Sequence, residues 1–491
     1  MAALMFLTLS LVGCEKEDDV KESGFYDLKS DVEVDFSAPR NVNYRPEGVG
    51  ALADVIPFYH GGKFELFYLY DHRGALQIEG TPWYLIETEN MVNFTERGLA
   101  IANSGDHDAD DTYAFTGSVI EKDGVFHAFY TGHNPYIPQQ VILHATSTDL
   151  VNWTTIPEDT LHKADRHEGT DFRDPYVFWY EEEQCYVMLV CVKLKSAPFN
   201  GAVDMYKSTD LSHWELVDSP LHVEYTSYLM ECPDVFRMGD WWYLVYYCSS
   251  TETKYLRSKS LYGPWENPTD FDGENFCAAK TATDGERRYL FGWNPTKNGT
   301  DDSSANSWGG NLIVYEIYPL EDGTLATKMP NGVYSAFSAK AYEGKDLTFG
   351  DSYGIEAEYM NFGLPEAYRV SFDVEMKGAA NAGVFVNASP EAGDNYSFQF
   401  CDEMSELAFG YCNGVRFDNY AFANRSRAYD FAGKVHCEIV VEKDIATIYI
   451  DNKITLTVRM MRDNGNDLAF FSDGGAVFSN IAVYGYGKSR S

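Results

Sequence analysis

Short runs of apolar, strand-favouring residues alternate with glycine-bearing turns over the first two thirds of the chain. Residues 228–249 give the clearest example, because apolar runs at 235–236 and 241–247 flank a turn at Gly239. Aromatic and β-branched residues on either side of a short glycine-containing turn predict an antiparallel β-hairpin. An acidic residue, Glu231, stands at the head of this hairpin.

The hairpin pattern occurs five times. The other four copies lie at residues 54–70, 116–130, 173–192 and 276–293. After the hairpin, a third predicted strand tends to end in a short motif that contains Ser, Leu and Trp. This motif occurs at residues 147–153, 208–214 and, more loosely, 260–265. Repeats of three or four short antiparallel strands, spaced by about 55–60 residues, predict a five-bladed β-propeller.

The regular spacing of the hairpin units ends near residue 335. Strand-like segments then alternate with Gly, Asn and Asp turns at residues 368–374, 382–386, 396–401, 435–441, 446–450 and 476–484, which predicts a two-sheet β-sandwich packed on the propeller. We therefore expect an all-β chain with a signal and linker at 1–38, the propeller at 39–330 and the sandwich at 331–491. Within the sandwich, Cys401 and Cys412 are candidates for a disulfide across a hairpin.

Three acidic residues stand at the heads of predicted innermost strands. They are Asp54, Asp174 and Glu231, in the first, third and fourth units, each shortly before a proline. The innermost strands of a propeller surround one axis, so residues at their heads converge although they are distant in sequence. A single acid at such a junction is commonly a solvated loop residue. Three acids at one structural offset indicate a functional site.

Composition narrows the classes of partner. The chain has 491 residues, 45% hydrophobic and 15% aromatic, which is enough for more than one core. Its formal net charge is −37, and such a field repels nucleic acids and anionic membranes but is compatible with a neutral sugar. The sequence contains no phosphate-binding glycine loop, no His-Glu-x-x-His segment and no Cys-x-x-Cys pair, so neither a cofactor nor a metal is expected.

The N-terminus begins with an apolar run, residues 2–12, that is too short to span a bilayer and is typical of an export signal. It ends in Leu-Val-Gly-Cys at Cys14, which resembles a bacterial lipobox. The acidic residues 15–19 resemble the surface-display signal of Bacteroidetes-type lipoproteins. We expect an exported protein, at the outer membrane or cell surface or in the periplasm, held to the membrane only by lipid on Cys14. The alternative is an ordinary signal peptide with an incidental cysteine.

Several motifs together resemble glycoside hydrolase family 32, the β-fructosidases that cleave sucrose and fructans. The resemblance covers about residues 45–485 and rests on Arg173-Asp174-Pro175, Glu231-Cys232 with Asp234, Ala114-Phe-Thr-Gly-Ser118, Phe129-Tyr-Thr-Gly132, Ala279-Lys280, Leu290-Phe-Gly-Trp293, Trp308-Gly-Gly and residues 439–453. It implies a hydrolase acting on an oligo- or polysaccharide that contains fructose.

The resemblance also implies roles for the three acids. Asp54 would be the nucleophile that attacks the anomeric carbon. Glu231 would protonate the leaving oxygen and then activate water, and Asp174 would bind sugar hydroxyls and stabilise the transition state. A retaining mechanism of this kind requires the two reacting carboxyl groups to lie about 5–5.5 Å apart.

Further substrate contacts are expected around the acids. Arg173 has three interpretations: it orients Asp174, it binds sugar, or it forms a structural salt bridge. Asp71 has two, a polar contact to sugar or a solvated turn. The full set of expected substrate-binding residues is Arg173, Phe115, Ser118, Asp71, Trp293 and Cys232.

Part of the family's sugar pocket is altered. Its first motif, usually Trp-x-Asn-Asp-Pro-Asn-Gly, has Ala51 and Ala53 in place of the Trp and first Asn. A Gln common in the following strand is Leu69. The reaction class is therefore better defined than the substrate.

Two other functions stay open. The Ala53-Asp54 phrase and the Ser-x-Asp-Leu-x-x-Trp strands also resemble family 43, which cleaves arabinosides and xylosides with inversion. The changed pocket is compatible with a surface glycan-binding lipoprotein that has lost turnover.

The acidic loop at residues 106–111 has acids at its first, third and fifth positions, a spacing that suits calcium. It lacks the glycine and the distant Glu of a full calcium loop, so an exposed acidic turn is the alternative.

Overall fold

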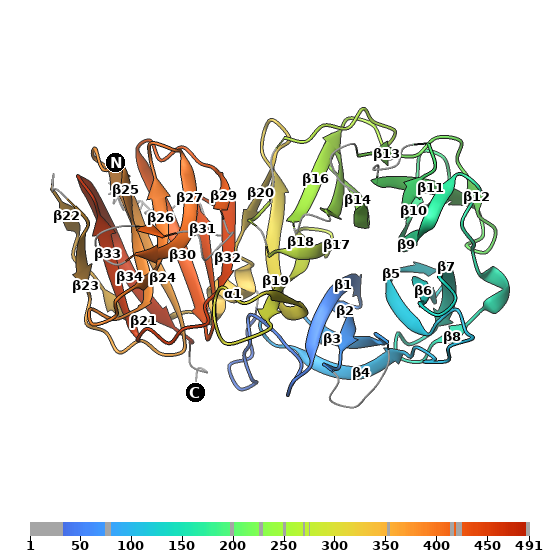
Figure 1. Cartoon of the computed structure of the whole chain (residues 1–491), viewed down its shortest axis with the longest axis horizontal. Helices are drawn as coiled ribbons and strands as arrows, with labels where there is room; N and C mark the ends of the chain where they lie inside the picture. The colour runs from blue at the N-terminus through green and yellow to red at the C-terminus, as the bar shows by residue number, and fades with distance from the viewer. Residues whose placement is uncertain are drawn as a thin grey trace, which may run out of the picture.

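Antiparallel strands make up nearly all regular structure in the computed structural model (Figure 1). The structure describes residues 33–73, 80–196, 201–224, 229–248, 252–268, 271–273, 275–350, 354–412, 417–418 and 425–487. The expected signal and lipid-attachment residue, Cys14, lies outside these residues. Within them, the one α-helix is α1 (Asn331–Ala336), and no helix is long and apolar enough to cross a membrane.

The propeller has five blades. Blade 1 contains β1 (Ala51–His60), β2 (Lys63–Asp71), β3 (Trp83–Thr88) and β4 (Thr95–Ile101). Blade 2 contains β5 (Tyr113–Lys122), β6 (Val125–Asn134), β7 (Gln139–Ser147) and β8 (Thr154–Thr155). Blade 3 contains β9 (His167–Tyr180), β10 (Cys185–Leu194), β11 (Gly201–Ser208), β12 (Glu215–Leu216) and β13 (His222–Val223). Blade 4 contains β14 (Met230–Met238), β15 (Trp241–Cys248) and β16 (Glu252–Ser258). Blade 5 contains β17 (Cys277–Thr283), β18 (Arg288–Lys297), β19 (Asn306–Pro319) and β20 (Leu325–Lys328).

The first and last blades share one sheet. Strand β1 pairs with β19 through Leu52 and Gly310, and the strand order runs β17-β18-β19-β1-β2-β3-β4. The ring seen in Figure 1 is therefore closed by backbone pairing as well as by side-chain packing. The five-unit pattern and the all-β fold expected from the sequence are confirmed.

The innermost strand of each blade contains a β-bulge at the same place. The strand register shifts after Ala53 in β1, and equivalent shifts occur in β5, β9, β14 and β17. In four blades the first bulged residue has a positive φ although it is not glycine: Asp54 (43°), Asp174 (59°), Cys232 (51°) and Ala278 (46°). A bulge adds one residue to a strand and redirects its side chain, and such features are frequent next to active sites.

A polar turn recurs at the outer edge of the blades. The Ser147 hydroxyl accepts hydrogen bonds from the amides of Asp149 and Leu150, while the Asp149 carboxylate accepts two amides further on. Ser208 and Asp210 repeat this arrangement in blade 3. Blade 1 has a third copy, in which Thr88 and Asn90 take the two positions. These turns explain the Ser-Asp-Leu phrase seen in the sequence.

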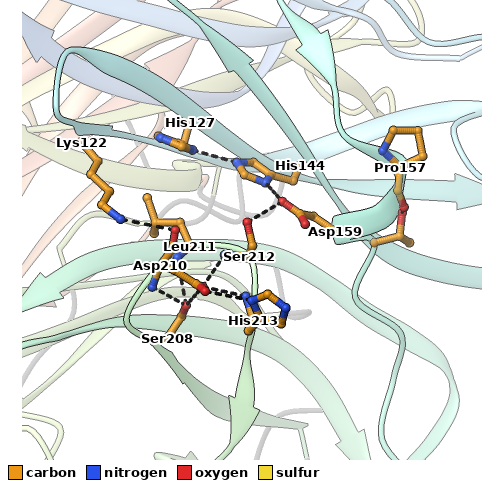
Figure 2. A network of polar contacts seen from close by, with 11 residues as sticks. Lys122, His127, His144, Pro157, Asp159, Ser208, Asp210, Leu211, Ser212 and His213 are labelled. Atoms are coloured by element: carbon orange, nitrogen blue, oxygen red, sulfur yellow. Dashed lines mark hydrogen bonds and ion pairs between the residues drawn. The ribbon is translucent and has the colours of Figure 1, made fainter.

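A buried polar chain joins blades 2 and 3 beside this turn (Figure 2). The rings of His127 and His144 are linked by a hydrogen bond of 2.9 Å, and His144 in turn contacts Asp159 Oδ2 at 2.7 Å. The hydroxyl of Ser212, which follows the blade 3 turn, donates to the same Asp159 oxygen at 2.9 Å. Burial lowers the pKa of His127 to about 4, so this contact between blades is formed by neutral rings at neutral pH.

The sandwich packs two seven-stranded sheets face to face. One contains β21 (Ala339–Glu343), β22 (Leu347–Phe349), β24 (Ala367–Met376), β30 (Lys434–Glu442), β31 (Ile445–Ile450), β32 (Ile454–Arg459) and β34 (Ala476–Gly485). The other contains β23 (Glu356–Tyr359), β25 (Asn381–Ala388), β26 (Asn395–Cys401), β27 (Glu406–Cys412), β28 (Phe417–Asp418), β29 (Arg425–Ala428) and β33 (Asp467–Ser472). Fully buried aromatic residues such as Phe372, Phe398 and Phe470 fill the space between them.

The expected disulfide between Cys401 and Cys412 is wrong. Cys401 lies opposite Glu406 in the β26–β27 pair, whereas Cys412 lies opposite Asn395. The two cysteines therefore sit at opposite ends of the hairpin, and no bond joins them.

Buried polar contacts fix the sandwich to the propeller. Arg459 of β32 donates to the carbonyl of Pro295 at 2.8 Å and to the side chain of Asn311 at 2.6 Å. Asp302, from a propeller loop, accepts the Tyr396 hydroxyl at 2.8 Å and the Met461 amide at 2.9 Å. Because these partners lie in both domains and are buried, separating the domains would leave unsatisfied polar groups.

Candidate active site

Asp54 lies at the bulge of the first blade. The bulge turns its carboxylate toward the indole of Trp293 in blade 5, and the Trp293 N–H donates to Asp54 Oδ1 at 3.1 Å. Burial raises the pKa of Asp54 to about 7, and the nearby charges of Asp174 and Glu231 act in the same direction. The Trp293 bond and the positive charge of Lys280 oppose this rise.

Asp174 occupies the same bulge position in blade 3 and is 3% exposed. Its amide donates to the Thr131 hydroxyl at 2.8 Å, and its Oδ2 accepts the amide of Cys232 at 2.9 Å. Burial raises the pKa of Asp174 to about 6, with Arg173 opposing and Glu231 reinforcing the effect. Asp174 is therefore held by the side chain of Thr131 in blade 2 and by the backbone of Cys232 in blade 4.

Glu231 stands one residue before the bulge position in blade 4, which Cys232 occupies. The expectation that all three acids share one offset is therefore wrong by one residue. Glu231 Oε1 accepts a hydrogen bond from Arg173 Nη2 at 2.7 Å, and its side chain is 25% exposed. Arg173 stands at the matching position one residue before the bulge of blade 3, so side chains from equivalent places in adjacent blades meet.

Arg173 connects the acids. Besides Glu231, its guanidinium contacts Asp171 Oδ1 at 2.5 Å and lies 3.8 Å from Asp174 Oδ2. Of the interpretations that the sequence left open, these contacts favour a residue that orients both acids. The carboxylates of blades 1, 3 and 4 thus lie close together: the charges of Asp174 and Glu231 raise the pKa of Asp54, and the charge of Glu231 raises the pKa of Asp174.

Lys280 is a site residue that the sequence reasoning did not single out, although it belongs to the Ala279-Lys280 motif. It is 2% exposed, and its ammonium group donates to the carbonyl of Gly117 at 2.6 Å. Its charge lowers the pKa of both Asp54 and Asp174, so it limits the repulsion between them.

Phe115 takes the bulge position in blade 2, which corresponds to that of Asp54 and Asp174 in their blades. Its ring is half-buried and stacks on His133 with centroids 4.8 Å apart. This placement is compatible with the expected role of Phe115 in lining the sugar site.

Two expected sugar contacts have scaffold roles instead. The Ser118 hydroxyl is buried and accepts the amide of Val177 at 2.9 Å, which argues against contact with sugar. The thiol of Cys232 is also buried, and only its amide reaches the site, through Asp174. Both residues join adjacent blades.

Asp71 pairs with Arg73, which in turn bonds to blade 5. The two side chains form an ion pair of 2.7 Å, and Arg73 Nη2 donates to the carbonyl of Trp308 at 2.9 Å and to the Thr296 hydroxyl at 2.7 Å. Asp71, whose side chain is 26% exposed, is therefore more than a solvated turn residue. It helps to hold the segment that carries Trp308.

The segment around Trp308 lies over the altered part of the pocket. Ala51 and Ala53 are fully buried, and a Cβ added at Gly309 would lie only 3.1 Å from that of Ala51. Gly309 also has φ near +75°, so the close approach requires glycine. Trp308 itself is 42% exposed and lies edge-on to Trp293, with centroids 6.3 Å apart. An exposed aromatic ring is thus placed beside the acids.

Within the described part of the chain, no group of three or more His, Cys, Asp or Glu side chains is placed to hold a metal ion. In the loop at residues 106–111, Asp106 accepts the amide of Asp108 at 3.0 Å, and Asn134 bonds to the carbonyl of Ala109 at 2.7 Å. These contacts describe a polar turn fastened to the end of β6.

Comparison with known proteins identifies the family. The model of the glycosyl hydrolases family 32 N-terminal domain matches residues 55–326. The levanbiose-producing levanase of Bacillus subtilis (strain 168) is 24% identical over 480 residues, which cover 87% of each chain. The raffinose invertase of Escherichia coli is 26% identical over 303 residues, which cover 55% of this chain and 60% of that protein. The latter match thus spans less than two thirds of the invertase.

Solved structures show the same architecture. Fructan 1-exohydrolase IIa from Cichorium intybus superposes with a TM-score of 0.75 at 15% identity, covering 93% of this chain and 98% of that one. Sucrose-6-phosphate hydrolase from Lactobacillus gasseri gives 0.72 at 17% identity, covering 91% and 92%. At these identities the structures support the fold alone. Since the family model matches more than half of the sequence, the chain belongs to glycosyl hydrolase family 32.

Proposed function

We propose that this protein hydrolyses fructosyl linkages of sucrose- or fructan-type glycans with retention of anomeric configuration. Membership of family 32 supports the reaction class, and relatives named as invertase and levanase support the sugar. The observation that carries the proposal is the meeting of Asp54, Asp174 and Glu231 at one end of the propeller.

In the first step of the proposed reaction, Asp54 is the nucleophile. Among the residues that the structure describes, Asp54 accepts one hydrogen bond, from Trp293, so its second oxygen is available to attack the anomeric carbon. The ionised form is the nucleophile. Burial disfavours ionisation, and the charge of Lys280 partly restores it. Attack breaks the glycosidic bond and gives a fructosyl ester on Asp54.

The second role is proton transfer. The side chain of Glu231 is 25% exposed, so it can exchange protons with solvent and with the leaving oxygen. It protonates that oxygen in the first step and accepts a proton from water in the second, when water releases fructose from Asp54. The Arg173 bond to Oε1 orients Glu231 so that its other oxygen faces the substrate.

Asp174 stabilises charge and position. Its Oδ2 is held by the amide of Cys232, and a buried carboxylate beside an oxocarbenium-like transition state offsets the positive charge on the sugar ring. Trp308 supplies an aromatic face for a sugar unit near the pocket that contains Ala51 and Ala53. We expect Trp308→Ala to raise KM more than it lowers kcat.

The proposal is tested by product analysis on sucrose, levan, inulin and an arabinoside panel. With methanol as a competing acceptor, retention gives the methyl β-fructoside, because the covalent intermediate is attacked from the original face. An inverted glycoside, or activity on arabinosides alone, would contradict it. Binding of fructans without turnover would favour the glycan-binding alternative.

We further propose that the chain is exported as a lipoprotein with lipid on Cys14, displayed at the cell surface. The Leu-Val-Gly-Cys sequence and the acidic residues that follow it support this. Metabolic labelling with a clickable palmitate should mark the wild type and not Cys14→Ala. Equal labelling of the wild type and of Cys14→Ala would contradict the proposal.

A further inference from the structure

Four charged side chains form a row that ends at the candidate active site, and their signs alternate. Lys193 Nζ contacts Asp171 Oδ2 at 2.7 Å, and Asp171 Oδ1 contacts Arg173 Nη1 at 2.5 Å. Arg173 Nη2 then donates to Glu231 Oε1 at 2.7 Å. Lys193, Asp171 and Arg173 belong to blade 3, whereas Glu231 belongs to blade 4. The row therefore ends on the residue that the proposed reaction uses for proton transfer.

The strands of blade 3 fix Asp171 against Arg173. The two residues stand two positions apart on β9, so their side chains point to the same side of the strand. Lys193 lies on the neighbouring strand β10. The side chains of Asp171, Arg173 and Lys193 are 17%, 11% and 18% exposed, so solvent screens their charges only weakly. A change of charge at Asp171 therefore changes the electrostatic potential at Arg173 and at Glu231.

Asp171 is ionised in this arrangement. Burial would raise the pKa of its carboxyl group, but the hydrogen bonds from Lys193 and Arg173 outweigh burial and hold the pKa below its ordinary value. The side-chain oxygen of Gln140, in blade 2, accepts a further hydrogen bond from Arg173 Nη1 at 3.3 Å. Asp171 and Gln140 thus fix one end of the guanidinium, while the other end reaches Glu231.

We propose that Asp171 is a positioning residue for the general acid of the reaction. It holds the Arg173 guanidinium so that Nη2 presents a donor to Glu231, and its negative charge offsets the positive charge that would favour loss of the Glu231 proton. This inference rests on the proposed function, because it assigns Asp171 to the proton-transfer step. The alternative is that the row is only a salt bridge that stabilises blade 3.

The charge of Asp171 should appear in the pH–rate profile. Asp171→Asn keeps the shape of the side chain but removes the negative charge between Arg173 and Lys193. We expect the alkaline limb of kcat/KM on sucrose, on which the general acid loses its proton, to move to lower pH by about half a unit or more. Lys193→Met removes a positive charge from the far end of the row, so the same limb should move to higher pH.

Other ionisable groups surround Glu231, and both variants leave them in place. Burial raises the pKa of three of them, which therefore stay neutral: the side chains of Cys191, Cys232 and Tyr247. The charged groups near Glu231, besides Arg173, are Asp54 on β1, Asp174 on β9 and Lys280 on β17. Opposite shifts in the two variants therefore report the charges of the row itself.

A substrate that needs no protonation separates positioning from structure. An aryl fructoside with a good leaving group loses its aryl group without a general acid. On the alkaline side of the wild-type optimum, Asp171→Asn should lower kcat/KM on sucrose by about threefold or more. It should change kcat/KM on the aryl fructoside by less than about twofold. A structural defect would lower both values alike.

Glu168→Gln is the matched control, because Glu168 is an exposed acid of the same strand, β9. Its pH–rate profile should equal that of the wild type. Melting temperatures show whether each variant is folded. If Asp171→Asn does not fold, Lys193→Met decides the question, and an alkaline limb that does not move upward in that variant overturns the proposal.

Four results would overturn the role of Asp171 while the proposed function stands. They are an unchanged profile in Asp171→Asn, shifts of the same sign in Asp171→Asn and Lys193→Met, equal losses on sucrose and the aryl fructoside, and a raised KM with unchanged kcat, which would mean that Asp171 binds sugar. Absence of turnover by the wild type would instead contradict the proposed function, and the role of Asp171 would be lost with it.

Discussion

Glu438 in the sandwich and the pair Asp54 and Asp174 in the propeller are carboxyl groups that burial affects alike but whose neighbours act in opposite ways. In the sandwich, Glu438 is 3% exposed and is paired with Arg369 at 2.7 Å and with His436 at 3.3 Å. Burial alone would raise the pKa of Glu438, yet these two partners hold it below its usual range. In the propeller, burial raises the pKa of Asp54 and Asp174 with only partial compensation.

This contrast separates a structural acid from a chemical one. Both carboxylate oxygens of Glu438 are bonded, one to Arg369 and the other to His436, so neither is available for chemistry. The propeller acids are left close together and short of positive charge, and such perturbed groups are typical of catalytic sites. A buried carboxyl group therefore stabilises the sandwich, where it is paired, and destabilises the propeller at the candidate site, where it is not fully compensated.

The largest expected effect is on turnover. Asp54→Asn removes the nucleophile and Glu231→Gln removes the general acid, so each should lower kcat by about a thousandfold or more. Asp240→Asn is the control, because Asp240 lies in the exposed turn between β14 and β15 of the same blade as Glu231. Steady-state kinetics on sucrose or levan measure this loss of kcat. An unchanged kcat in either variant would contradict the catalytic role of that residue.

Breaking the saturated pair in the sandwich should affect folding and leave the chemistry intact. Arg369→Met leaves Glu438 buried beside His436 alone and removes the stacking of Arg369 on Tyr484. We expect a loss of about 3–5 kcal/mol of unfolding free energy in denaturant titration. Lys377→Met, which breaks an exposed pair with Glu375, should change it by less than about 1 kcal/mol. A similar loss in both variants would mean that burial is not what distinguishes the pair.

Acid should inactivate the propeller site before it unfolds the sandwich. Because Asp54 must be ionised to attack and its pKa is raised to about 7, the fraction of active protein falls as pH drops through this value. We expect kcat/KM to decrease about tenfold for each pH unit below about pH 6–7. A pH–rate profile that stays flat down to about pH 4 would show that Asp54 is ionised throughout.

The smallest effect is a gain in stability from removing a catalytic acid. A carboxyl group with a raised folded-state pKa takes up protons on folding, so stability falls as pH rises between the unfolded value of 3.8 and the folded value of about 7. Asp54→Asn should therefore stabilise the protein by about 1–2 kcal/mol near pH 8. This gain should vanish below about pH 3, where the wild-type group is mostly protonated in both states. Destabilisation by Asp54→Asn at high pH would contradict the account of strain.

Much of this was predictable from the sequence. Alternating apolar residues predicted strands such as β26 and β31 with their observed C-terminal ends, and the hairpin spacing predicted five blades. The acids at the strand heads were found because propeller geometry brings such positions together.

Other features depend on contacts between segments that are distant in sequence. A one-residue difference at the bulge separates Glu231 from the offset of Asp54, and no local pattern marks it. The partner of Ser118 is Val177 of the next blade, so a hydroxyl group that resembled a sugar ligand serves the scaffold. Asp71 pairs with the nearby Arg73, and it is Arg73 that reaches Trp308 in blade 5.

In the proposed mechanism, the carboxylate of Asp54 forms a covalent bond to the sugar while Glu231 transfers the proton. In Glu231→Gln, an aryl fructoside with a good leaving group should still react with Asp54, but release by water should be slow because the base is missing. Mass spectrometry of the stalled protein is the most direct measurement. We expect one added fructosyl unit on the peptide that contains Asp54. A fructosyl group on another residue, or continued turnover with Asp54 unmodified in every sample, would contradict it.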